Sequence, residues 1–267
     1  MPDPLYVRAR RALLDALEAL EPHRDTLVLV GAQALYLHTG AAEFAFAEFT
    51  TDADLALVPG ELAGAPLLAD LLRAHGFAPR EHPGSWSSPD GIAVDLMVPE
   101  SLAGPGRRGA RLGPHGSRAA RRAKGLEAAL VDRARHTIRA LDPSDGRSVE
   151  IWVAGPAALL VAKTHKIAER IGVADRVRDK DALDVLRLLR AVSTAELARR
   201  LSNLRESAIS ATVSNEAVVL LPLLFGSADA EGIQLAVRAV GGSEDPATIT
   251  ASLVTLLGDL LEALDGA

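Results

Sequence analysis

Two aspartates at the start of a short apolar stretch limit, more than any other feature, what this chain can form. Residues 49–58 read FTTDADLALV, and their alternation predicts a strand. Successive side chains of a strand point to opposite faces, so Asp52 and Asp54 share one face, while Ala53, Leu55 and Leu57 point the other way, to the core. Carboxylates about 7 Å apart suit a divalent cation, which prefers charged oxygen ligands. A strand edge with two solvated acids is the alternative.

The composition indicates an ordinary folded protein with a core of small aliphatic residues. The chain has 267 residues, of which 48% are hydrophobic but only 3% aromatic, so Ala, Leu and Val must fill the core. The absence of cysteine excludes disulfides, thiolate metal sites and cysteine nucleophiles. A net charge of −6 argues against a general nucleic-acid coat but allows a local basic patch. We see no signal peptide and no run long enough to span a bilayer, so we expect a cytoplasmic protein with no membrane partner.

A glycine joins a predicted strand to a predicted helix near the N-terminus. Residues 26–30 (TLVLV) are continuously apolar, Gly31 follows directly, and a helix is expected over residues 32–38. The unpaired N–H groups and the dipole of a helix N-terminus favour anions, so Gly31 and Ala32 could hold a phosphate. A tight strand-to-helix turn without a ligand is the alternative.

A third aspartate lies inside a second apolar strand, predicted over residues 91–98. Asp95 would be costly in this position unless it is paired or binds a ligand. A helix predicted over residues 61–75 separates this strand from the Asp52 strand, which favours pairing of the two in one sheet. We therefore expect Asp95 to be a third ligand of the same cation. A salt-bridged acid or one at the strand end is the alternative.

The segment of residues 101–124 is rich in glycine and arginine and contains no acid, so it is either a solvated loop or a basic surface that faces a substrate. After it we predict a helix over residues 125–140 and a strand over residues 147–153.

From Pro156 onward the pattern is helical. A helix predicted over residues 156–171 begins with proline and places Lys163, Lys166 and Arg170 on one face. The next helix opens near Asp179 and places Asp181 and Asp184 on one face.

Further helices are expected from a capping box at Ser193 to Glu196 and over residues 211–225, 231–240 and 246–264. We predict an α+β protein: a mixed sheet flanked by helices in residues 1–154, followed by a helical domain in residues 155–267.

The order of these features resembles that of the AbiEii/AbiGii toxin-type nucleotidyltransferases, within the DNA polymerase β-like nucleotidyltransferase superfamily. The resemblance covers about residues 25 to 190 and rests on the strand-glycine-helix, Thr51-Asp52-Ala53-Asp54, Asp95, Lys163, Arg170 and Lys180-Asp181 with Asp184. It implies transfer of a nucleoside monophosphate from a nucleoside triphosphate (NTP) to an acceptor.

The resemblance also implies roles for single residues. Asp52, Asp54 and Asp95 would bind Mg²⁺ or Mn²⁺, and Asp95 would also accept the proton of the acceptor hydroxyl. Lys163 would neutralise phosphate charge, and Asp181 would orient that lysine. The nucleotide-binding residues would be Gly31, Ala32, Thr51, Lys166, Arg170 and Lys180. A plain interhelical salt bridge is the alternative for Lys163 and Asp181.

The acceptor implied by the resemblance is a tRNA end or a protein side chain, modified by the toxin of a toxin–antitoxin pair that has a cognate antitoxin. The arginine-rich segment would suit an RNA backbone, because phosphate contacts dominate such affinity. Two other functions stay open: a catalytically degenerate binding protein that keeps the nucleotidyltransferase fold, and an enzyme that modifies a small molecule such as an antibiotic.

Overall fold

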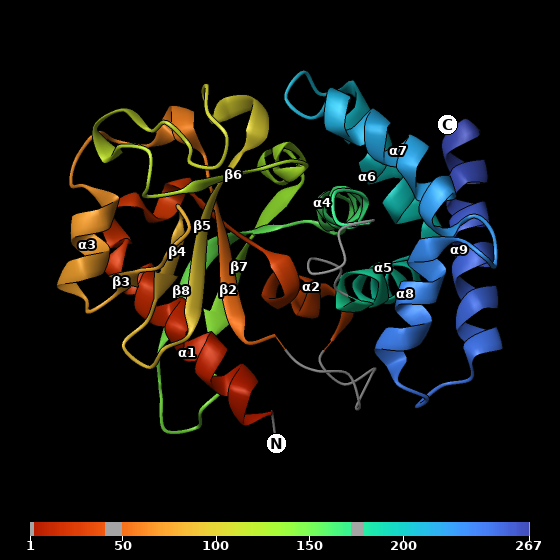
Figure 1. Ribbon diagram of the computed structural model, residues 1–267, viewed down its shortest axis with the longest axis horizontal. Coiled ribbons are helices and arrows are strands. Elements are labelled where there is room, and N and C mark those ends of the chain that lie inside the picture. The colour runs from red at the N-terminus through yellow and green to blue at the C-terminus, as the bar shows by residue number, and fades with distance from the viewer. Residues whose placement is uncertain (1–2, 41–49, 172–178, 267) are drawn as a thin grey trace. The chain divides into compact units, whose positions relative to one another are not determined.

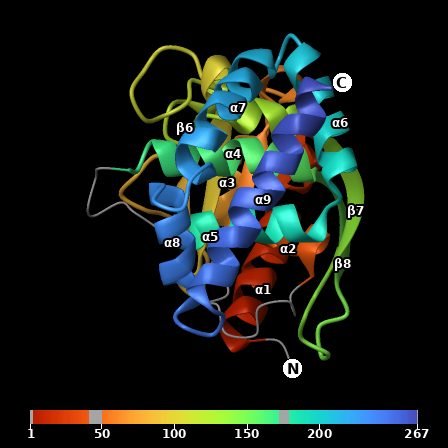
Figure 2. The ribbon, with the colours of Figure 1, turned by 90° about the vertical axis from the view of Figure 1, so that its right-hand side faces the viewer.

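The computed structural model describes residues 3–40, 50–171 and 179–266. The chain divides into two compact units, which Figures 1 and 2 show in two views. We name them the sheet unit (residues 1–34 and 49–154) and the helical unit (residues 35–48 and 155–267). The division falls inside helix α2 (Gly31–Thr39).

The sheet unit contains one mixed sheet, as the sequence predicted. Its strands are β1 (Leu27–Val30), β2 (Asp52–Leu57), β3 (Ala78–Pro79), β4 (Ser85–Ser87), β5 (Ala93–Pro99), β6 (Arg121–Ala123), β7 (Arg133–Arg139) and β8 (Ser148–Ala154). The strand order is β3-β4-β5-β2-β1-β8-β7, and β6 pairs with β5 off this path. The pairs β1–β8, β2–β5 and β5–β6 are parallel, whereas β1–β2, β4–β5 and β7–β8 are antiparallel.

Two α-helices of this unit flank the sheet. Helix α1 (Pro4–Ala19) begins at an Asp3 cap whose carboxylate accepts a hydrogen bond from the N–H of Leu5 at 2.7 Å, and it packs against β2, β5 and β8. Helix α3 (Leu68–Ala74) packs against α1. Short 3₁₀ turns occupy Glu21–Thr26, Pro59–Glu61, Glu100–Leu102, Gly113–His115 and Leu126–Leu130.

The helical unit is a bundle of amphipathic helices. They are α4 (Pro156–Ala168), α5 (Asp179–Ala191), α6 (Thr194–Glu206), α7 (Ala211–Phe225), α8 (Glu231–Val240) and α9 (Pro246–Asp265). One half of the predicted capping box is present, since the Ser193 hydroxyl accepts a hydrogen bond from the N–H of Glu196 at 3.3 Å, while Oε1 of Glu196 accepts one from Nε of Arg200 at 2.9 Å. Helix α5 packs against α4, α8 and α9, and α6 packs against α9, so the leucines on their inner faces form the core.

Two expectations about local structure were wrong, and three short strands were not predicted. Residues 125–140 do not form a helix, because Gly125 takes a left-handed conformation and Arg133–Arg139 pairs with β8 as an edge strand. The helix predicted over residues 61–75 is shorter, Leu68–Ala74, since Pro66 disfavours helical geometry in the residue before it. The sequence also gave no sign of β3, β4 and β6, which are two or three residues long.

Helix α9 corrects the expectation that no run is long enough to span a bilayer. Among the described residues, it is the one helix that is long and apolar enough to cross a membrane, judged by length and composition. Its buried residues Ile249, Leu253, Leu257, Leu260 and Leu264 recur at helical spacing and line one face. Of its most apolar window, 28% is buried, and one such helix is by itself weak evidence for a membrane span.

Candidate active site

The pairing of β2 with β5 brings the three predicted aspartates onto one face of the sheet. The two strands are parallel, with Asp54 in register with Asp95 and Asp52 in register with Ala93. Paired residues and residues two apart share a face, so Asp52, Asp54 and Asp95 lie together on what we call the aspartate face. The opposite face carries Ala53, Leu55, Val94 and Leu96, all buried in the core.

Asp54 lies directly over the start of helix α2. Its strand neighbour across β1 is Val30, the last residue before Gly31. Gly31 has a φ of +68°, and a Cβ added to it would overlap Oδ2 of Asp54. Glycine is needed here both for the backbone conformation and for this close approach. The anion nearest the N-terminus of α2 is therefore the chain's own carboxylate, next to Gly31 and the buried Ala32.

Asp52 is held by a residue just before its own strand and by a residue of helix α2. Its Oδ1 accepts a hydrogen bond from the Thr50 hydroxyl, and its backbone carbonyl accepts one from Nε2 of Gln33 at 3.0 Å. Gln33 is buried and also binds Arg10, whose Nε donates to Oε1 at 2.9 Å. Thr51, a predicted nucleotide-binding residue, is exposed.

Sequence reasoning missed Gln33 and Arg10. The available signal was a glutamine inside an otherwise apolar helix, which folding buries only when it is hydrogen-bonded.

Asp95 is paired with an arginine that the sequence did not connect to it. Nε and Nη2 of Arg121, from β6, both approach Oδ2 of Asp95, at 3.2 and 3.1 Å. The Arg121 side chain is 33% exposed and the Asp95 side chain is 23% exposed, so water reaches the pair. The salt-bridged alternative weighed for Asp95 describes this contact.

The aspartates suit a divalent cation by donor type and by register. Mg²⁺ and Mn²⁺ prefer carboxylate oxygens, and two parallel neighbouring strands supply three of them on one face. In the described ranges, however, no group of three or more His, Asp or Glu side chains is arranged to hold an ion. Asp95 points toward Arg121 and Asp52 points toward Thr50. The three carboxylates therefore share a face of the sheet but do not point to a common centre.

Some arginines of the arginine-rich segment bind the rest of the sheet unit, and some are exposed; Arg118 is both. Arg118 donates to the carbonyls of Arg80 and Glu81, while Arg122 binds Glu100 and the carbonyl of Gly106. These two, like Arg121, hold the segment on the sheet unit. The exposed arginines are Arg107, Arg108, Arg111 and Arg118.

The predicted basic and acidic residues of the helical unit meet in a buried ion cluster between α4 and α5. Nζ of Lys163 lies 2.7 Å from Asp181 Oδ1 and 2.6 Å from Asp184 Oδ2. Lys166 and Arg170 also reach Asp181, at 3.0 and 3.2 Å. The Lys163, Asp181 and Asp184 side chains are 7%, 6% and 0% exposed, whereas Lys166 and Arg170 keep 39% and 26%.

Arg187 completes the ion cluster and was missed by sequence reasoning. Its Nη1 lies 3.0 Å from Asp184 Oδ1, and its guanidinium lies over the Tyr36 ring, 5.6 Å from the ring centroid. Its spacing of three from Asp184 on one helix was the available signal. Lys180, a predicted nucleotide-binding residue, lies half-buried in the first turn of α5.

The charges of the cluster stabilise one another. Burial by itself would raise the pKa of Asp181, but the charges of Lys163 and Lys166 and their hydrogen bonds outweigh it and hold that pKa well below its ordinary value. Burial would likewise lower the pKa of Lys163, but Asp181 and Asp184 raise it above its usual range. Asp181 and Lys163 are therefore both charged at neutral pH.

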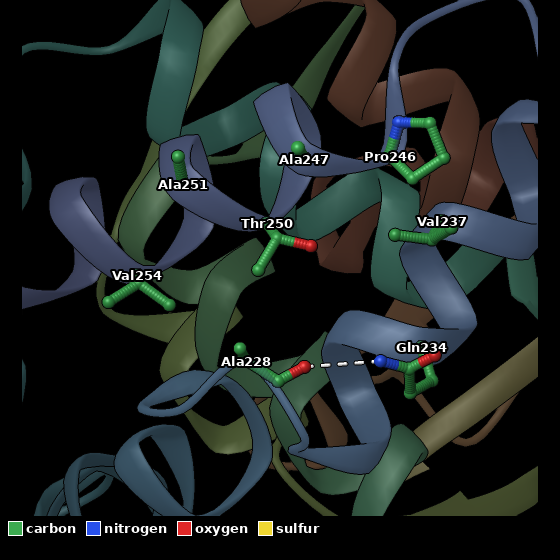
Figure 3. Close-up of a pocket in the computed structure, with 8 residues that line it drawn as sticks. All are labelled: Ala228, Gln234, Val237, Pro246, Ala247, Thr250, Ala251 and Val254. Carbon is green, nitrogen blue, oxygen red and sulfur yellow. Dashed lines mark hydrogen bonds between the residues drawn. The ribbon is translucent and has the colours of Figure 1, made fainter.

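A hollow of about 460 Å³ lies in the helical unit, beside α8 and the start of α9 (Figure 3). Its lining residues are Ala228, Gln234, Val237, Pro246, Ala247, Thr250, Ala251 and Val254. None of the eight is titratable, and Gln234 donates to the carbonyl of Ala228 at 3.1 Å. The residues that line this hollow offer no group for acid–base chemistry and no carboxylate for a cation.

Comparison with known proteins gave one finding. The family model described as nucleotidyltransferase matches residues 8–210, which span the aspartate face, the ion cluster and helix α6. No curated protein and no solved structure matches the chain.

Proposed function

The chain belongs to the nucleotidyltransferase family, and from this premise we propose that Asp52, Asp54 and Asp95 form its active site and bind a divalent cation, Mg²⁺ or Mn²⁺. Family membership assigns the activity in its general form, transfer of a nucleoside monophosphate from an NTP. The observation that carries the site assignment is the register of β2 on β5, which aligns Asp54 with Asp95 and leaves Asp52 on the same face.

The proposed reaction is a displacement at the α-phosphorus. The acceptor oxygen forms a bond to this phosphorus, the bond to the α,β-bridging oxygen breaks, and pyrophosphate leaves. A bound cation would neutralise the triphosphate and stabilise the charge that develops in the transition state. Asp95 takes the proton of the acceptor hydroxyl on Oδ1, because Arg121 approaches the other oxygen, Oδ2. Gly31 allows Asp54 to lie against α2, which fixes the position of that carboxylate.

In the helical unit we propose separate roles for the basic residues. Lys163 is enclosed by two carboxylates and acts as the interhelical brace that positions α5 against α4, with Asp181 as its main partner. Lys166 and Arg170 keep exposed parts of their side chains, and we assign phosphate binding to them. Lys180 is assigned to nucleotide binding on the family resemblance alone.

We also propose that the acceptor is a tRNA end or a protein side chain and that the enzyme acts as the toxin of a toxin–antitoxin pair. The resemblance to AbiEii/AbiGii proteins supports this, as do the exposed arginines 107, 108 and 111, which suit a phosphate backbone. Induced expression of the wild type in a bacterium should then arrest growth, and the double substitution Asp52→Asn, Asp54→Asn should relieve the arrest. Arrest by both proteins would contradict the toxin role.

A transfer assay tests the proposed active site. The protein is incubated with each of the four NTPs, labelled at the α-phosphate, with Mg²⁺ or Mn²⁺ and with total tRNA or total protein as acceptor. We expect label on an acceptor, and a loss of about 100-fold or more in rate for Asp54→Asn, because a lost charged contact to the reacting group has effects of this size. Asp90→Asn, an exposed acid just before β5, is the matched control and should keep the wild-type rate. Equal rates for Asp54→Asn and wild type would overturn the site.

A further inference from the structure

The backbone of β6 packs closely against β5, and this packing fixes the backbone position from which the Arg121 side chain extends. The two strands pair in parallel, with Met97 in register with Arg121 and Val98 with Arg122. A Cβ at Gly84 would overlap the backbone N of Arg121 and the carbonyl O of Leu96, so glycine is required for this close packing. Arg121 therefore rises from a rigid strand on the same face as Met97 and Asp95.

The Arg121 side chain, in contrast, is held by one contact. Within the described part of the chain, Asp95 is the one carboxylate in salt-bridge range of Arg121, and both nitrogens approach the same oxygen, Oδ2. A guanidinium and a carboxylate can instead form two parallel bonds, which are stronger and more specific. The observed pair is single-sided and partly exposed, and exposed pairs hold weakly.

We infer that Arg121 is an exchangeable counter-ion of the active site: it pairs with Asp95 while no cation is bound, and binds the triphosphate of the nucleotide once a cation takes that carboxylate. This inference rests on the proposed function of the aspartate face. A cation on Asp95 repels the guanidinium, while a triphosphate beside it offers several oxygens to the planar fork of an arginine. The rigid strand and the weakly held side chain allow this exchange without movement of the sheet.

The exchange predicts two effects of opposite sign for one substitution. Without the positive charge at position 121, the aspartates should bind a cation more tightly. Without the guanidinium, the cation-loaded site should bind a nucleotide less tightly. A purely structural arginine predicts instead that both affinities fall together or that neither changes.

Arg122 supplies the matched control. It lies next to Arg121 on β6 but binds Glu100 and the carbonyl of Gly106, and its neighbour in register is Val98, on the opposite face from Asp95. Arg122→Gln removes the same charge from the same strand and should change neither affinity by more than about twofold.

The experiment follows thermal unfolding of the whole chain. Wild type, Arg121→Gln, Arg121→Lys and Arg122→Gln are each titrated with Mn²⁺ alone. At saturating Mn²⁺ they are then titrated with the α,β-methylene analogue of each NTP. For Arg121→Gln we expect about tenfold tighter Mn²⁺ binding and at least tenfold weaker analogue binding. Arg121→Lys keeps the charge but loses the planar fork, so its Mn²⁺ affinity should match wild type while its analogue affinity falls part of the way.

Each outcome decides a different claim. An unchanged or weaker Mn²⁺ affinity in a folded Arg121→Gln variant overturns the counter-ion role, while the proposed active site stands. Unchanged analogue affinity overturns the triphosphate role. If wild type responds to neither Mn²⁺ nor Mg²⁺, the cation site and the inference that rests on it both fail. If Arg121→Gln does not fold, Arg121→Lys decides, because wild-type analogue affinity in that variant contradicts a role for the fork.

Discussion

The aspartate face of the sheet unit and the ion cluster of the helical unit both combine carboxylates with basic side chains, but they differ in burial and in the number of partners. In the ion cluster, Asp181 contacts three basic side chains and Asp184 contacts two. Water hardly reaches either carboxylate. On the aspartate face, Asp95 contacts one arginine in a pair that water reaches.

This difference separates a structural use of charge from a chemical one. Charges buried together with their partners are costly to separate, so the ion cluster resists any exchange of partners. A partly exposed pair has little net energy to lose and can be replaced by a ligand. We therefore expect the ion cluster to control stability and the aspartate face to control ligand binding.

The largest effect should come from breaking the ion cluster. Asp184→Ala leaves Lys163 and Arg187 buried with one carboxylate fewer, and should lower the free energy of unfolding by about 3–5 kcal/mol. Asp179→Ala is the matched control on the same helix, since its partner Arg238 lies in an exposed pair. It should cost less than about 1 kcal/mol. Urea unfolding measures both, and equal costs would remove the distinction between buried and exposed charge.

The next effect tests the aspartate face as a ligand site. At a Mn²⁺ or Mg²⁺ concentration about 100-fold above the dissociation constant, the melting temperature of the wild type should rise by about 5–10 °C. Asp52→Asn with Asp54→Asn should abolish the rise, whereas Asp181→Asn should keep it, because Asp181 belongs to the ion cluster. Thermal scans with and without cation measure the response. A response lost only in Asp181→Asn would reverse our assignment of the two centres.

The pH dependence of stability sharpens the same comparison. The pKa of Asp181 is lower in the folded than in the unfolded protein, so its contribution is present above the unfolded pKa of about 3.9 and is lost as the pH falls below it. The gap in unfolding free energy between wild type and Asp181→Asn should thus narrow between pH 5 and pH 2, by on the order of 2 kcal/mol. The pKa of Lys163 is raised, so its contribution should persist to pH 10 and be lost only above.

Urea midpoints at pH 10, 7, 5, 3 and 2 measure this dependence for both proteins. A gap that stays constant down to pH 2 would contradict a charge-based ion cluster.

The smallest effect concerns Gly31 and the placement of Asp54. Gly31→Ala must accept both a positive φ and an overlap with the Asp54 carboxylate, whereas Gly91→Ala accepts a positive φ of similar size in open space. Gly91→Ala should cost about 1 kcal/mol, and Gly31→Ala about 1–2 kcal/mol more. Gly31→Ala should also weaken the Mn²⁺ response, because Asp54 must move. Equal costs for the two variants would show that Asp54 is not packed against Gly31.

Much of the α+β architecture was readable from local patterns. The continuously apolar residues 27–30 and the alternating residues 52–57 form central strands, and the periodic residues after Pro156 form the helices of the bundle. Where the sequence pattern fitted both a helix and a strand, pairing with a neighbouring strand determined the structure. Arg133–Arg139 has helix-compatible residues, yet it pairs along its whole length with β8, with Ile138 in the core and Arg133 and Arg135 over the Trp152 ring. Tertiary context overrode a weak propensity.

For the candidate site, the sequence by itself determined which residues could do chemistry: two aspartates on one strand face, a third in another strand, and a lysine with two aspartates at helical spacings. Only the tertiary structure decided their partners. Arg121 and Asp95 are 26 residues apart, and they meet because β6 settles on β5 in one register beside Gly84. A shift by one residue would turn Arg121 to the other face. The register depends on strand pairing across the whole sheet, which residues near in sequence do not encode.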